Sequence, residues 1–204
     1  MLPEMDDKNA DIAAIAEKAL ADSQLLSSIL EGLTNKNETL RYNCHKVLMT
    51  LSREHGGIVY PNWDYIVEQL SSSNTYHRLT AVSILAVLAA VDKDNRFDEI
   101  FDKYFGLLGD KGTIPAIYVA RNAGKIAVAK PHLREAITDR LLGIEKIYKG
   151  KQPELTKSAI IEAFDEFYEE SESRERIREF VSSQLGSESP KTKKAAKAFI
   201  DKWG

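Results

Sequence analysis

Residues 77–91 read HRLTAVSILAVLAAV, and in this stretch Ala81, Ile84, Leu85 and Leu88 lie three, one and three positions apart. This spacing places four apolar side chains on one face of an α-helix. The earlier stretch LRYNCHKVLMTLS carries apolar residues at the same four places. A recurring helical segment of this kind suggests that the chain is built from repeats.

The repeat returns five times, at intervals of about 36 to 40 residues. A period in this range is typical of stacked arrays in which each unit buries its apolar face against its neighbours. Six columns stay apolar when the five units are aligned. They are Leu33, Leu70, Leu108, Tyr148 and Leu185; Ile29, Ile66, Tyr104, Ile144 and Val181; Cys44, Ala81, Ala120, Ile160 and Ala196; Val47, Ile84, Ala123, Ala163 and Phe199; Leu48, Leu85, Gly124, Phe164 and Ile200; and Leu51, Leu88, Ala127, Phe167 and Trp203.

Each unit contains two amphipathic segments joined by a polar turn, so we predict an all-α fold of about five helical pairs without strands. The expected first helices span 25–33, 63–70, 98–108, 133–148 and 177–185, and the expected second helices include 40–52, 77–91 and 191–203. Residues 10–24 are expected to form an N-terminal capping helix, because the open end of a stack needs a cover. Residues 1–9 are expected to be flexible, and residues 1–204 to form a single domain.

The third unit differs from the others because its second helix carries small residues in the apolar columns. Ala120, Ala123, Gly124 and Ala127 fill all four columns of this helix with small residues, whereas every other unit has larger side chains in at least two of them. Small residues allow neighbouring helices to approach closely, although Gly124 weakens the helix by roughly 1 kcal/mol. We therefore expect neighbouring helices to approach closely here and the local curvature to change.

Composition narrows the function classes. The 204 residues are 43% hydrophobic and 29% charged, and the formal net charge of −3 gives no bulk electrostatic reason to bind nucleic acid or an anionic membrane. The single cysteine, Cys44, excludes an internal disulfide and fits a reducing compartment. No apolar run approaches the roughly 18 residues of a membrane span, and the acidic N-terminus differs from a secretory signal. We expect a cytoplasmic protein.

A cation recurs early in the second helix of four units, at Arg41, Arg78, Lys157 and Lys193. The third unit has Ile117 in this position. With the helical pairs of about 38 residues, this column makes residues 25–204 resemble the HEAT-repeat family. The resemblance implies a right-handed α-α superhelix of five HEAT-like repeats, with the second helices on the concave surface.

In that family an acidic or amide residue of the turn commonly pairs with the cation, and Asn37, Asn74 and Glu154 lie three or four residues before it here. The cations therefore have two interpretations. They bond the turns of the repeats, as a periodic structural device would, or they form a basic stripe for acidic partners.

Further cations and aromatic residues lie along the same second helices, including His45, Arg121, Lys125, Lys194 and Lys197, while acidic residues gather on the first helices. Tyr118 shares a column with Tyr42 and is a possible aromatic anchor. The candidate partner-binding residues are Arg41, His45, Arg78, Tyr118, Arg121, Lys125, Lys157 and Lys193.

No catalytic or metal-binding constellation is present in the sequence. The four histidines form no i, i+4 pair, and the carboxylates between Glu162 and Glu170 lack the alternating ligands and central glycine of a calcium loop. We expect no cofactor, no metal and no enzymatic activity.

One enzyme class nevertheless needs comparison, because some DNA alkylation-repair glycosylases are built from HEAT-like repeats. Asn62-Trp63-Asp64 resembles their recognisable Asn-Trp-Asp stretch, but Val67 stands where the catalytic acid would be. Trp63 also falls in a core column. The expected function is a non-catalytic scaffold that binds a protein or peptide on the concave surface. The alternative is a nucleic-acid binder or a diverged glycosylase. The identity of the partner and the oligomeric state stay open.

Overall fold

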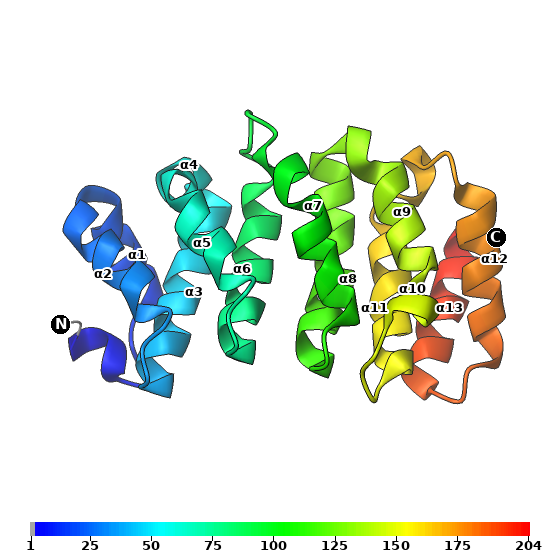
Figure 1. Ribbon diagram of the computed structural model, residues 1–204, viewed down its shortest axis with the longest axis horizontal. Coiled ribbons are helices and arrows are strands. Elements are labelled where there is room, and N and C mark those ends of the chain that lie inside the picture. Colours follow the sequence, from blue (N-terminus) through cyan, green and yellow to red (C-terminus); the bar gives the residue numbers. More distant parts are fainter. Residues whose placement is uncertain (1–2) are drawn as a thin grey trace. The chain divides into compact units, whose positions relative to one another are not determined.

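The computed structural model describes residues 3–204, and every regular element in this range is a helix, which confirms the all-α prediction (Figure 1). The chain divides into two compact units, residues 1–93 and residues 94–204, which we call the N-terminal and C-terminal units. Each unit is described by itself.

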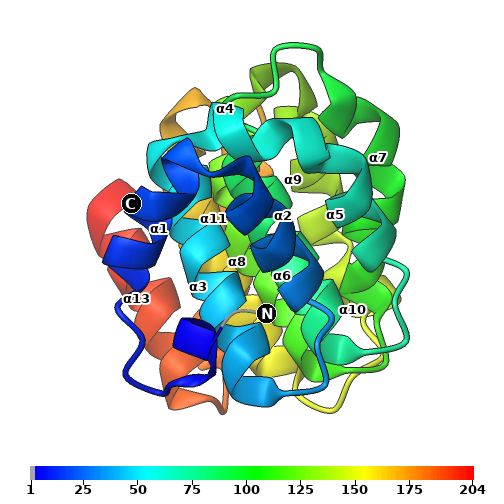
Figure 2. The ribbon, with the colours of Figure 1, turned by 90° about the vertical axis from the view of Figure 1, so that its left-hand side faces the viewer.

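The N-terminal unit is a capping helix followed by two helical pairs. Its elements are η1 (Pro3–Asp6), α1 (Ile12–Ala21), α2 (Ser23–Gly32), α3 (Glu38–Glu54), α4 (Gly56–Val59), η2 (Tyr60–Asn62), α5 (Trp63–Gln69) and α6 (Thr75–Leu88). Helix α1 packs against α2 and α3, and α3 packs against α6 (Figure 2). The apolar columns of this unit are buried, since Ile29, Ile66, Cys44 and Ala81 are fully inaccessible to solvent.

The amide residues of the turns cap helices. The Asn37 side chain accepts hydrogen bonds from the backbone N–H groups of Thr39 and Leu40, and Asn74 accepts one from Tyr76. An asparagine at this position satisfies backbone donors that have no partner within the helix. The side-chain oxygens of Asn37 and Asn74 are thus engaged by the N-termini of α3 and α6. The third turn residue, Glu154, lies 3.2 Å from the Lys157 ammonium, which is the pairing that the resemblance implied.

The N-terminal segment is more ordered than the sequence suggested. Residues 3–6 form η1, and the Met5 side chain is only 1% exposed. The Asn43 side-chain amide donates to the backbone oxygens of Met5 at 2.9 Å and Asp7 at 2.8 Å, which ties the segment to α3. Residues 1–2 of the segment 1–9, which was expected to be flexible, lie outside the described part.

The C-terminal unit consists of three helical pairs. Its elements are α7 (Arg96–Gly106), η3 (Leu107–Gly109), α8 (Thr113–Ala129), η4 (Pro131–Leu133), α9 (Arg134–Leu142), α10 (Ile144–Ile147), α11 (Pro153–Asp165), η5 (Tyr168–Glu170), α12 (Arg174–Ser183), η6 (Gln184–Gly186) and α13 (Pro190–Trp203). Helix α11 packs against α8 on one side and α13 on the other. The expected helix over 133–148 is interrupted at Gly143, which separates α9 from α10.

Helices α8 and α11 approach closely at Gly124. A Cβ atom added to Gly124 would lie 2.7 Å from the backbone oxygen of Ala163 and 2.9 Å from the Cβ of Glu166. Such distances are shorter than real side chains permit, so only glycine fits at this contact. The expectation of close packing at the small-residue column is confirmed.

The fifth unit departs from the aligned columns. Leu185 is 42% exposed, whereas its neighbour Gln184 is buried. Residues 184–186 form the 3-10 helix η6, yet Leu108 in the corresponding 3-10 helix η3 of the third unit is fully buried. Ile200 and Trp203 on α13 are only half-buried, so the last unit follows the repeat less closely than the first three.

Candidate partner-binding surface

We call the recurring cations Arg41, Arg78, Lys157 and Lys193 the ladder cations. The first two bond the turns of their own repeats. The Arg41 guanidinium donates to the backbone oxygen of Asn35 at 2.8 Å, and the Arg78 guanidinium donates to that of Ser72 at 2.7 Å. Each acceptor lies six residues before its arginine, so the two repeats use the same contact. The Arg41 side chain is 12% exposed. This geometry supports the structural interpretation for both arginines.

Lys157 is also engaged within the protein. Its ammonium lies 3.0 Å from a Glu145 oxygen and 3.2 Å from a Glu154 oxygen. Partial burial opposes the charge, but the hydrogen bonds to these two carboxylates raise the pKa of Lys157 above its ordinary value. A hydrogen bond from Ser187, together with Lys157, lowers the pKa of Glu154. Of the four ladder cations, Lys193 is the exposed one.

His45 contributes no positive charge at neutral pH. Burial lowers the pKa of its imidazole to about 4, and the nearby Arg53 adds to the shift. The Nδ1 atom is buried without a hydrogen-bond partner in the described part of the chain. The pKa of His77 is lowered as well, chiefly by burial. His45 was expected to add to the positive charge of the second helices, whereas its surroundings favour the neutral form.

The exposed surface of α8 carries cations that bond no turn. The Arg121 guanidinium lies 5.4 Å from the centre of the Tyr118 ring, and the Lys125 ammonium lies 3.1 Å from Oδ1 of Asn122 on the same helix. Both cations are exposed. Burial raises the pKa of Glu166 on the neighbouring α11, and the charge of Lys125 opposes this shift. Arg121 and Lys125 therefore present two charges to solvent beside the half-buried ring of Tyr118.

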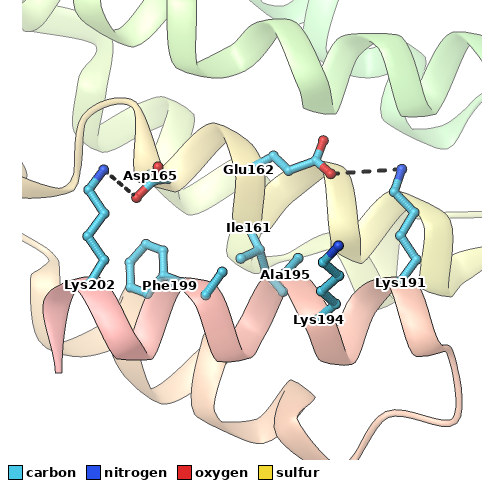
Figure 3. A pocket seen from close by; sticks show the side chains of 9 residues that line it. Ile161, Glu162, Asp165, Lys191, Lys194, Ala195, Phe199 and Lys202 are labelled. Atoms are coloured by element: carbon cyan, nitrogen blue, oxygen red, sulfur yellow. Dashed lines mark hydrogen bonds and ion pairs between the residues drawn. The ribbon is translucent and has the colours of Figure 1, made fainter.

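Helices α11 and α13 enclose an open groove of about 450 Å³ (Figure 3). Ile161, Ala195, Ala198 and Phe199 form its apolar floor. The two alanines leave space that larger side chains would fill. We call this feature the α11–α13 groove.

Charged side chains surround this floor. The Lys191 ammonium lies 3.8 Å from a Glu162 oxygen, and the Lys202 ammonium lies 2.9 Å from an Asp165 oxygen (Figure 3). Lys194 stands between these two pairs and has no hydrogen-bond or ion-pair partner among the described side chains. From the sequence, Lys194 was expected only to add positive charge to the second helices. Its lack of a partner was not predicted, because the ion pairs of the neighbouring lysines form only when α11 and α13 pack.

The structure brings only some of the predicted site residues together. Tyr118, Arg121 and Lys125 share the exposed face of α8. Arg41 and Arg78 form a repeated structural contact in the N-terminal unit, and Lys157 and Lys193 lie outside the lining of the α11–α13 groove.

Side chains that could bind a metal, act as a nucleophile or contact nucleic acid are not arranged for these roles in the described part of the chain. Within residues 3–204 no group of three or more histidine, cysteine, aspartate or glutamate side chains is arranged to hold a metal ion. Burial raises the pKa of the Cys44 thiol to about 12, so it is protonated at neutral pH. Trp63 is 1% exposed, and its ring packs 5.6 Å from that of Tyr60. Its place in a core column is confirmed, and it does not face solvent as a nucleic-acid contact would.

Comparison with known proteins adds information on the fold alone. No protein-family model and no curated protein matches the sequence. The crystal structure of an engineered protein, determined by a structural genomics consortium, is similar with a TM-score of 0.53 and 18% sequence identity. The match covers 95% of this chain and 88% of that one. No helix in the described part of the chain is long and apolar enough to cross a membrane.

Proposed function

We propose that this protein is a non-catalytic scaffold that binds a protein or peptide segment on the exposed face of its second helices. In this proposal the helical pairs form a right-handed HEAT-like superhelix, and the second helices line its concave surface. The succession of α2–α3, α5–α6, α7–α8, α9–α11 and α12–α13 supports this arrangement, because the first four pairs bury most of the same columns and the fifth buries part of them.

One observation carries the proposal. The second helices of the C-terminal unit expose cations that serve no structural contact with a turn, beside an aromatic ring on α8 and an apolar groove on α13. Arg41 and Arg78, by contrast, are bound to carbonyl oxygens. Exposed charge beside an apolar depression suits recognition of a protein segment, in which charges set orientation and apolar contacts supply affinity.

The mechanism is complementarity without a chemical step. A rigid surface of packed helices loses little conformational freedom on binding, so more of the contact energy appears as affinity. The proposal has the protein act in the cytoplasm, since its one thiol suits a reducing compartment. No cofactor is required.

Affinity purification of the tagged full chain from native lysate, with and without nuclease, tests the proposal. We expect a defined protein partner that stays bound after nuclease treatment. Recovery of nucleic acid alone, or loss of every protein after nuclease, would contradict the proposal and favour the nucleic-acid alternative.

A further inference from the structure

We propose that the α11–α13 groove docks an acidic amphipathic segment of a protein partner. An apolar side chain of that segment occupies the floor, and a neighbouring carboxylate pairs with Lys194. This inference rests on the proposed scaffold function and specifies where the partner binds and what chemistry it presents.

The floor of the groove suits one bulky apolar side chain. Ile161 and Phe199 are 1% and 2% exposed, so they form a fixed apolar base. Ala195 and Ala198 project too little to fill the space above that base, which has a volume of about 450 Å³. Covering this surface with an aliphatic or aromatic side chain would remove apolar area from water.

The rim of the groove favours a carboxylate at one position. Two of its three lysines already lie beside a carboxylate, Lys191 beside Glu162 and Lys202 beside Asp165. Lys194 is the third lysine and lacks such a partner within residues 3–204. A partner carboxylate placed there would complete a row of three ion pairs.

The signs of the rim charges distinguish a peptide from a nucleic acid. A phosphate backbone would bring several negative charges close to Glu162 and Asp165, which line the groove together with the lysines. Like charges at an interface are unfavourable, and nucleic-acid binding draws its affinity from neutralising many phosphates. A peptide can present a single carboxylate to Lys194 and an apolar side chain beside it.

A random dodecapeptide library displayed on phage, panned against the full chain, tests this assignment. We expect enriched sequences to carry Asp or Glu within four residues of Leu, Ile, Met or Phe. A fluorescein-labelled peptide of the consensus sequence should bind at least about tenfold more weakly to Lys194→Glu than to the wild type, as measured by fluorescence anisotropy. Lys194→Met should also weaken binding, because it removes the charge without adding a negative one.

Two further variants make the test specific. Lys197→Glu makes the same charge change on α13 at an exposed residue outside the groove lining, so we expect affinity to change by less than about twofold. Ala198→Phe fills the floor at an exposed position, so we expect it to abolish binding. Thermal melting followed by circular dichroism should give all four variants the wild-type transition.

Each other result overturns the inference. A consensus peptide that binds Lys194→Glu and Lys194→Met as tightly as wild type would place the site elsewhere, and a consensus without an acidic residue would refute the partner chemistry. Failure to enrich any sequence over the bare support would refute peptide docking in the groove. The scaffold function itself depends on the lysate experiment, so the two proposals can fail separately.

Discussion

At the scale of single residues, Gly124 offers the clearest test of helix packing. Replacing glycine by alanine inside a helix ordinarily stabilises a protein by up to about 1 kcal/mol. At Gly124 the added methyl group would collide with the Ala163 backbone oxygen. We therefore expect Gly124→Ala to destabilise the protein by about 1–3 kcal/mol, as overpacked cores do.

Urea unfolding measures this effect, and Gly106→Ala is the matched control. Gly106 has helical backbone angles, and a Cβ there would meet nothing within 4 Å. The Gly106→Ala substitution should therefore be neutral or stabilise the protein by up to about 1 kcal/mol. Equal effects of the two substitutions would contradict the close contact between α8 and α11.

An arginine that bonds a turn and an exposed arginine should differ in their contribution to the free energy of unfolding. Arg78→Met removes the hydrogen bond to the Ser72 backbone oxygen, so we expect a loss of about 1.5–3 kcal/mol. Arg121→Met removes an exposed charge and should change the free energy of unfolding by less than about 0.5 kcal/mol. Chemical denaturation of both variants checks this difference. A large loss for Arg121→Met would mean that the α8 cations are structural.

The buried imidazole of His45 should make stability depend on pH. Its folded-state pKa of about 4 lies below the ordinary value of 6.5, so between these values the unfolded chain binds a proton that the folded protein does not. Stability contributed by neutral His45 is therefore complete above about pH 6.5 and is lost as the pH falls toward 4. We expect the loss between pH 7 and pH 5 to be about 2 kcal/mol.

His45→Gln isolates this contribution, because Gln cannot titrate. The variant should lose less stability than wild type between pH 7 and pH 5 in urea unfolding. Parallel pH profiles of the two proteins would show that His45 is solvated and titrates normally.

At the scale of helices, burial should distinguish two leucines that the sequence treats alike. Leu85 on α6 is fully buried, whereas Leu185 in η6 is 42% exposed. We expect Leu85→Ala to cost about 2–5 kcal/mol and Leu185→Ala less than about 1 kcal/mol. Thermal and urea unfolding check both values. A cost for Leu185→Ala as large as that for Leu85→Ala would contradict the exposed position of Leu185 in η6.

The same comparison shows what the sequence could predict. Helix positions followed from apolar spacing, because burying one face of a helix requires a period near 3.6 residues. The alignment failed at Leu185, where Gln184 is buried instead, because apolar spacing does not show which residue of a short turn faces inward. It also missed the break at Gly143 between α9 and α10.

Side-chain partners were predicted less well than helices. Asn37 and Asn74 were expected to pair with cations, yet they cap α3 and α6. Either partner is chemically suitable for an amide, so geometry decides between them. The α11–α13 groove was missed for the same reason, since Ile161 and Ala198 lie in different repeats and meet only when the helices pack.

At the scale of the whole molecule, the proposal assigns different roles to the two helices of each pair. In this proposal the second helices supply the binding face, and the first helices lie away from the partner. Tyr118 on α8 and Glu99 on α7 belong to one helical pair and represent the two surfaces, with Arg121 beside Tyr118. A probe at each position can therefore report which surface contacts the partner.

Site-specific photo-crosslinking tests the central claim most directly. The photoreactive residue p-benzoylphenylalanine would replace the half-buried Tyr118 in one protein and the exposed Glu99 in the other. After irradiation in nuclease-treated native lysate, we predict a discrete protein adduct from position 118 and none from position 99. An adduct from position 99 alone would contradict the account, because it would place the partner on the first helices.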